Sequence, residues 1–239
     1  MRKSLLFALS CLAVGCSSVE TNGLLVDYAF DPLEFNGAFA DDHMLMGAAV
    51  PTVQCSTSSD CTVPGASPTQ LSCDAAACTG TAEVRLPLAV DLSSATLPTQ
   101  VVQLGVSAVT VKKIAYWIKS DTVNVALPKI DIYVASSAAK DEHDSTAVLV
   151  GSVTPLSARA TACSGSSDHA GDTSAGSSPV CDVTLTSAGS SALAQFCKDY
   201  QQSFQFIVHT ELSAKAGDAI PSGGIDFLLR PTVIFTVLR

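Results

Sequence analysis

Large apolar or aromatic residues recur at every second position along four segments of this chain, residues 114–118, 130–134, 225–229 and 233–237. Successive side chains of a β-strand point to opposite faces, so each segment predicts a strand with one face in a core. The apolar parity changes between Val111 and Ile114, which predicts a bulge at Lys112 and Lys113. Candidate strands cover residues 83–92, 101–111, 113–118, 123–127, 130–134, 148–153, 180–186, 204–212, 225–229 and 233–238.

One amphipathic helix is predicted at residues 190–200, where Leu193, Phe196, Cys197 and Tyr200 share a face. Many short strands with a single helix predict an all-β fold, a β-sandwich of short antiparallel strands. We expect the sandwich domain to cover residues 82–239, preceded by a Cys-rich, disulfide-stapled insertion at 55–81. Residues 16–54 are interpreted as a tether followed by an extended or partly helical piece packed on the domain.

The first residues have the pattern of an export signal. Met1-Arg2-Lys3 is positively charged, residues 4–14 are mostly apolar, and small residues precede Cys16. The apolar run is too short to span a membrane. We therefore predict that residues 1–15 are a signal peptide that is removed on export.

The segment Leu12-Ala13-Val14-Gly15-Cys16 resembles the lipobox of bacterial lipoprotein precursors. The resemblance implies that Cys16 is diacylated and becomes the new N-terminus, and that Ser17 directs the protein to the outer membrane or cell surface. The membrane is then a partner through the N-terminal lipid. An ordinary secretory signal is the alternative, because Ala13 and Gly15 also fit a signal-peptidase site; the product would then be periplasmic or diffusible and secreted.

Parts of the body also resemble β-rich bacterial lipoproteins, notably residues 109–117, 124–133 and 216–226. This resemblance implies an envelope location and a β-rich fold, and it brings no catalytic residue with it.

The charge excludes a nucleic-acid partner. The whole chain has 13 basic and 22 acidic residues, and removal of Arg2 and Lys3 leaves a net charge of −11. Such a surface repels a phosphate backbone, and no Lys/Arg cluster interrupts it. Common nucleotide and metalloprotease motifs are also missing from the sequence, so we expect no cofactor.

The remaining cysteines fall into two groups. Two disulfides are expected within a first group, whose pairing the sequence leaves open, and a third is expected between Cys163 and Cys181. Zinc is the alternative for the first group, although the usual C-x2-C spacing is absent. Cys197 is then left as a buried free thiol. The first group consists of Cys55, Cys61, Cys73 and Cys78.

Two further features suggest sites. Residues 140–144 place three carboxylates around a histidine, and they predict either a solvated loop or a metal site; the candidate ligands are Asp141, Glu142, His143 and Asp144. Tyr116 and Trp117 are candidates for an exposed aromatic binding face, with core packing as the alternative; because they are neighbours on one strand, alternation places at most one of them in the core.

The function expected from these features is that of an exported, lipid-anchored, non-enzymatic structural or binding module with a protein or glycan partner. The alternative is a metal-dependent or hydrolytic envelope enzyme that uses the cluster around His143.

Overall fold

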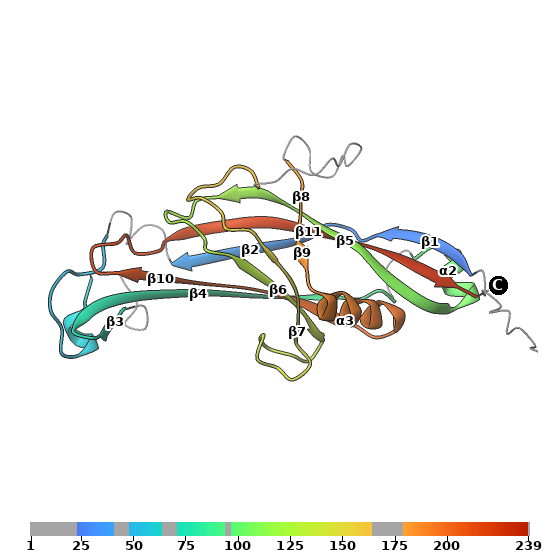
Figure 1. Ribbon diagram of the computed structural model, residues 1–239, viewed down its shortest axis with the longest axis horizontal. Helices are drawn as coiled ribbons and strands as arrows, with labels where there is room; N and C mark the ends of the chain where they lie inside the picture. Colours follow the sequence, from blue (N-terminus) through green and yellow to red (C-terminus); the bar gives the residue numbers. More distant parts are fainter. Residues whose placement is uncertain (1–22, 41–47, 64–70, 94–96, 164–178, 239) are drawn as a thin grey trace, which may run out of the picture.

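The computed structural model describes residues 23–40, 48–63, 71–93, 97–163 and 179–238, and shows two antiparallel sheets packed face to face in an elongated molecule (Figure 1). The predicted signal peptide and the segment that resembles a lipobox lie outside the described residues. None of the helices in the described ranges has the length and apolar character that crossing a membrane requires.

The first sheet is organised around its longest apolar strand. β11 (Gly223–Val237) pairs on one side with β5 (Val106–Asp121), which in turn pairs with β8 (Cys181–Asp182). Along its other side β11 pairs with β1 (Leu24–Ala29) and β2 (Leu33–Ala40). Every second residue of β11 is buried along its whole length, because its apolar parity continues unbroken through Pro231. The two predicted strands 225–229 and 233–238 are therefore one strand.

The second sheet has the order β3-β4-β10-β6-β7-β9. β10 is central and pairs with β4 over twelve positions and with β6 over six. The strands are β3 (Leu71–Asp74), β4 (Ala77–Val90), β10 (Phe204–Lys215), β6 (Ile130–Ser136), β7 (Val148–Val153) and β9 (Thr184–Leu185).

The predicted bulge in β5 is confirmed. Lys113 pairs with Thr232 and Val111 pairs with Val233, which leaves Lys112 as the extra residue. Because of this extra residue, the apolar side chains on both sides of the bulge point toward the core. The predicted strands 101–111 and 113–118 therefore belong to one strand, β5.

α3 (Ser187–Lys198) packs against β5 of one sheet and β7 of the other. Thr186 caps it: its hydroxyl accepts a hydrogen bond from the Gly189 N–H (2.9 Å) and donates one to the Leu149 carbonyl (2.6 Å). Gly189 lets the helix approach β7 at backbone distance, since a Cβ there would collide with the Val150 Cα. The helix thus begins three residues earlier than predicted.

Three local predictions are wrong. Residues 99–104 form the short helix α2 (Thr99–Leu104), which begins directly after Pro98, and not the start of a strand. Residues 123–127 are not a strand; Pro128 follows them, and only Leu127 makes an isolated bridge, to Leu156. The boundary expected between residues 81 and 82 falls inside β4.

The N-terminal region contributes more than a tether. β1 and β2 are extended segments that complete the first sheet, and Phe35 and Phe39 of β2, together with Phe30 directly after β1, are buried in the main core. Their sequence mixes Asp, Asn and Gly with aromatic residues, which obscures the alternation. With both sheets contributing to a shared core, the predicted all-β fold with antiparallel strands and disulfides is confirmed.

Candidate functional site

The loop between β6 and β7 folds over the outer face of the second sheet. Ala139 and Ala147 of this loop pack with Ala135, Ile207 and Tyr133 in a small apolar cluster separate from the main core. The Gln205 side chain of β10 donates a hydrogen bond to the Ala139 carbonyl and so fixes the loop to the sheet. This packing brings residues 140–144 down onto the strands.

Four charged or ionisable side chains meet under the loop, and we call them the ionic cluster: Glu83, Arg85, Glu142 and His209. Arg85 and His209 are paired across β4 and β10, so their side chains share the outer face. Arg85 donates two hydrogen bonds to Glu142, from Nε (2.7 Å) and Nη2 (2.9 Å), and a third from Nη2 to Glu83 (2.5 Å). His209 Nε2 lies 2.7 Å from Glu83 Oε1 and 3.8 Å from Glu142 Oε1.

Glu142 is the most enclosed member of the ionic cluster, with its side chain only 5% exposed. Burial is the largest single influence and opposes its ionisation, but the hydrogen bonds from Arg85 and from the Glu142 backbone, together with the attraction of nearby positive charge, outweigh it, and the pKa of Glu142 is lowered from its ordinary value. In return, the hydrogen bond to Glu142 raises the pKa of Arg85 further. The cluster therefore holds a charged carboxylate against the sheet.

The predicted ligand set is brought together only in part. The exposed His143 places its Nε2 3.1 Å from Glu142. Asp141 accepts a hydrogen bond from the His143 backbone (3.0 Å), and Asp144 accepts two from Thr146. These bonds from Thr146 lower the pKa of Asp144. Within the described ranges no three of the four predicted ligands gather their ligand atoms, because Asp141 and Asp144 shape the turn.

A different triplet has metal-ligand geometry. One ligand atom each from Glu83, Glu142 and His209 lies within 4.8 Å of the others. The guanidinium of Arg85 already forms ion pairs with both carboxylates of this triplet. A divalent cation would have to displace Arg85 or share the carboxylates with it, at the cost of cation repulsion. The arrangement fits an ion-pair network that fixes the loop better than a metal site.

Local sequence patterns did not single out Glu83, Arg85 or His209 as site residues. The alternation of β4 gives a usable signal, since Glu83 and Arg85 lie on the face opposite to Ala82 and Val84, which are buried. Their meeting with Glu142 depends on the β4–β10 register and on the loop, which no local pattern contains.

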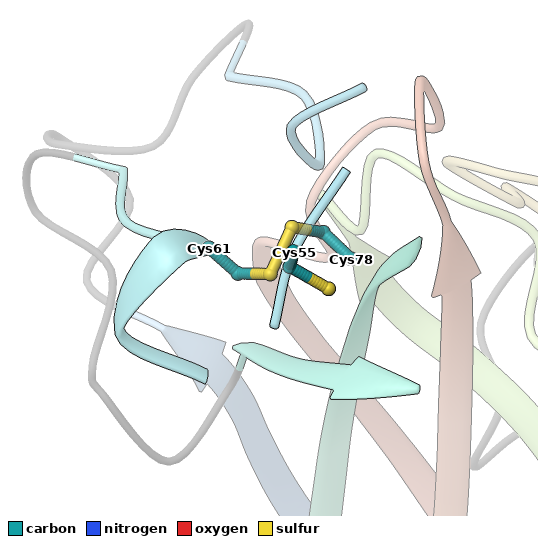
Figure 2. A group of neighbouring side chains, drawn as sticks. All are labelled: Cys55, Cys61 and Cys78. Atoms are coloured by element: carbon teal, nitrogen blue, oxygen red, sulfur yellow. A yellow bond between two sulfur atoms is a disulfide. The ribbon is translucent and has the colours of Figure 1, made fainter. Parts of the chain in front are cut away.

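Two disulfides tie the far end of the second sheet, which we call the stapled end (residues 48–63 and the β3–β4 hairpin). The bridges join Cys55 to Cys73 and Cys61 to Cys78. Cys55, Cys61 and Cys78 lie close together and are buried, as Figure 2 shows. The predicted disulfides are confirmed, and because the sulfurs of this group are bonded in pairs, the zinc alternative is overturned.

The hairpin turn at the stapled end is strained. Asp74 pairs with Ala77, so Ala75 and Ala76 form a two-residue turn, and both have positive φ angles, 47° and 64°. Turns of this kind favour Asn-Gly, because residues other than glycine and asparagine rarely adopt positive φ. The flanking disulfides at Cys73 and Cys78 hold the turn in this geometry.

A pocket of about 380 Å³ and one of about 330 Å³ are present in the described part of the chain. The second adjoins the stapled end, since Ala214 on its wall also packs with the disulfide cysteines. Its other walls come from the β10–β11 turn and from the segment after β5, with the lining residues Val125, Ala126, Leu212, Ser213, Asp218, Ala219 and Pro221. The lining is mostly apolar, with one carboxylate.

The predicted bridge between Cys163 and Cys181 is present. Cys197, the predicted free thiol, is fully buried on the inner face of α3 in line with Gly189 and Leu193. Burial raises the pKa of Cys197 to about 12. A thiol with such a pKa is not ionised near neutral pH and is a poor nucleophile.

The expectation that Tyr116 or Trp117 forms an exposed binding face is wrong, because both are buried, at 1% and 3% exposure. Tyr116 points into the main core. Trp117 is on the outer face of β5, but it packs with Val180 and Leu228 in a separate cluster. The Cys163–Cys181 disulfide fixes the segment that carries Val180. This segment is distant from β5 in the sequence and covers the outer face of β5, which alternation alone predicts to be exposed.

No protein-family model matches this chain, and no curated protein matches its sequence. Among solved structures, a chain from the cryo-EM structure of T=3 Penaeus vannamei nodavirus is similar to it, with 8% sequence identity and a TM-score of 0.26. The similarity covers 100% of this chain and 62% of the nodavirus chain. At that score it carries no argument about function.

Proposed function

We propose that this chain is an exported envelope protein, anchored to the outer membrane or cell surface through a diacylated Cys16, that acts as a non-enzymatic structural or binding module. The observation that carries the proposal is the set of three disulfides, which persist in oxidising compartments and are rare in the cytosol. The export signal and the lipobox resemblance agree with that compartment.

The shape of the molecule supports a binding role for the stapled end. β1 lies at one end of the long axis and the β3 hairpin at the opposite end (Figure 1). An anchor that precedes β1 would leave the stapled end and its adjoining pocket pointing away from the membrane. Disulfides there hold a surface in one shape before a protein or glycan partner arrives, which lowers the entropy cost of binding.

The test is the intact mass of the protein purified from its native membranes, with thiols alkylated before and after reduction. A mass that begins at Cys16 with added acyl groups, six bridged cysteines and one free thiol supports the proposal. A Cys16→Ser variant should then lose the acyl mass and leave the membrane fraction. A soluble, unacylated wild-type product would overturn the anchor and favour a diffusible secreted protein.

A metal-dependent envelope enzyme is the second candidate, because Glu83, Glu142 and His209 gather three ligand atoms. Calorimetric titration of the purified protein with Zn²⁺ and Mn²⁺ separates the two candidates. Micromolar binding that is lost in Glu83→Gln would favour the enzyme. We expect no such binding, since Arg85 occupies the carboxylates.

A further inference from the structure

Five of the six large apolar side chains that are exposed in the described part of the chain gather at one end of the molecule. We call this group the apolar tip: Leu24, Leu25, Val102, Leu104 and Leu238. Leu25, Val102 and Leu238 are more than half exposed, at 66%, 55% and 55%. Exposed apolar groups gathered in this way mark a contact surface.

Three separate segments build the apolar tip. Leu24 of β1 pairs with Val237 of β11, one residue before Leu238. The Leu238 N–H donates a hydrogen bond to the carbonyl of Gly105 (3.2 Å), which follows α2 directly. α2 also contacts β11, and β1, α2 and the C-terminal end of β11 lie together in Figure 1. The tip is therefore a product of the fold and not one apolar run.

The apolar tip also lacks charge in a strongly acidic protein. Residues 92–111, 231–238 and 23–26 contain no Asp, Glu, Lys or Arg, and Arg239, which follows Leu238 in the sequence, is the one charged residue adjacent to these segments on that side. The nearest charged residues within the elements of the tip are Asp27 and Lys112, which pair with each other (3.4 Å). Insertion of the tip into an apolar phase therefore desolvates no charged side chain of these segments.

The candidate lipid attachment point is only a short distance along the chain from the apolar tip. Seven residues separate Cys16 from Leu24, so the Cα atoms of these two residues are at most about 28 Å apart. Acyl chains on Cys16 would thus hold the apolar tip within reach of the bilayer surface. From these observations we propose that the apolar tip rests in the interfacial layer of the membrane and orients the protein; the idea rests on the proposed lipid anchor.

The bilayer accounts for the tip better than a second copy of the chain. A tip-to-tip dimer would enclose both β1 strands, and the two anchors would have to leave from the middle of the interface. A membrane surface takes the tip and the acyl chains from the same side. Partly buried apolar side chains beside lipid chains add to membrane affinity.

This orientation also supports the binding role proposed for the stapled end. With the apolar tip on the membrane, the disulfide-bonded β3–β4 hairpin stands at the opposite end of the long axis (Figure 1), and the pocket adjoins that end through Ala214. Val53, the sixth exposed apolar residue, belongs to that distant end and serves as an internal control.

The test uses the lipidated full chain in phosphatidylcholine vesicles whose acyl chains carry bromine, which quenches tryptophan at short range. The chain has one tryptophan, Trp117, which is buried and gives a constant background. Two variants are compared, Val102→Trp at the tip and Val53→Trp as the matched control. We expect the fluorescence of the tip tryptophan to fall about twofold and that of the control to stay unchanged. Adding Leu25→Asp and Leu104→Asp should abolish the tip quenching while the lipid keeps the protein on the vesicle.

Equal quenching of both variants, or quenching of neither, would overturn the membrane tip even if Cys16 is acylated. A doubled mass by light scattering, with the tip tryptophan shielded in the absence of vesicles, would overturn it in favour of a dimer. The Cys16→Ser variant, which lacks the acylated cysteine, distinguishes the proposed lipid anchor from the proposed apolar tip. If the native protein carries no lipid, the anchor fails, and quenching of Val102→Trp in the Cys16→Ser chain at high lipid concentration would still support the tip.

Discussion

Cys73 lies directly opposite Cys78 across the β3–β4 hairpin, yet the two are not bonded to each other. Each is bonded instead to the segment that precedes the hairpin, at Cys55 and Cys61. The hairpin is thereby fastened to residues 48–63, which have only isolated bridges and one short 3-10 turn, η1 (Ser58–Asp60), of their own.

Removal of the Cys61–Cys78 bridge is expected to destabilise the protein substantially. The bridge closes a loop with a sequence separation of 17 residues, which corresponds to about 3 kcal/mol in the loop-entropy description. The variant Cys61→Ala/Cys78→Ala should lose about that much free energy of unfolding in urea denaturation. An unchanged denaturation midpoint would show that the stapled end does not take part in the main unfolding transition.

The strained turn at Ala75 and Ala76 predicts a substitution that stabilises the protein. Ala75→Asn/Ala76→Gly replaces two residues at positive φ with residues that adopt it easily, and should raise the free energy of unfolding by about 1–2 kcal/mol. The control Ala77→Gly, in the strand beside the turn, should lower it instead. If both changes destabilise the protein, the turn is not strained.

The ionic cluster should stabilise the loop over the second sheet. Arg85→Ala leaves Glu142 enclosed without its partner, but Arg85 is itself about one third exposed, so we expect a loss of about 1–2 kcal/mol. Adding Glu142→Gln should recover part of that loss, because the unpaired charge is removed. A double-mutant cycle from urea denaturation measures this coupling, and strictly additive effects would contradict it.

The same cluster predicts a dependence on pH. The folded state lowers the pKa of Glu142, so its stabilising effect is complete above the unfolded-state pKa of about 4.3 and is lost as pH falls through the lower folded-state pKa. The difference in free energy of unfolding between wild type and Glu142→Gln should be present at pH 7 and should vanish in acid. A difference that stays constant across this range would assign the effect to packing.

Gly189 should tolerate no side chain. Gly189→Ala would collide with the backbone of β7, so we expect a loss of about 2 kcal/mol or more despite the higher helix propensity of alanine. Ser187→Ala, exposed in the first turn of the same helix, is the control and should change stability by less than about 0.5 kcal/mol. Thermal unfolding of both variants tests this close contact.

Cys197 should be inert in the folded protein. Its thiol is fully buried and its pKa is raised to about 12 by burial, so iodoacetamide at pH 8 should leave it unmodified. After denaturation without reductant, one thiol should react. Rapid labelling of the native protein at Cys197 would show that α3 opens from the sheets.

The sequence by itself determined the strands with the clearest alternation, β5, β6 and β11, and the places where disulfides form. Alternation in β5, β6 and β11 is local and strong, because each strand has one face in a core, and even the bulge at Lys112 is visible as a change of parity. The grouping of cysteines likewise limited the bridges to near neighbours along the chain.

Only the tertiary structure decided which groups meet. Four features join segments that are far apart in the chain. They are the Cys55–Cys73 pairing, the packing that buries Trp117, the apolar tip and the ionic cluster of Glu83, Arg85, Glu142 and His209. Such contacts follow from strand register and from the path of loops across the sheets. These depend on the free energy of the whole packed core, and no short window of residues contains that information.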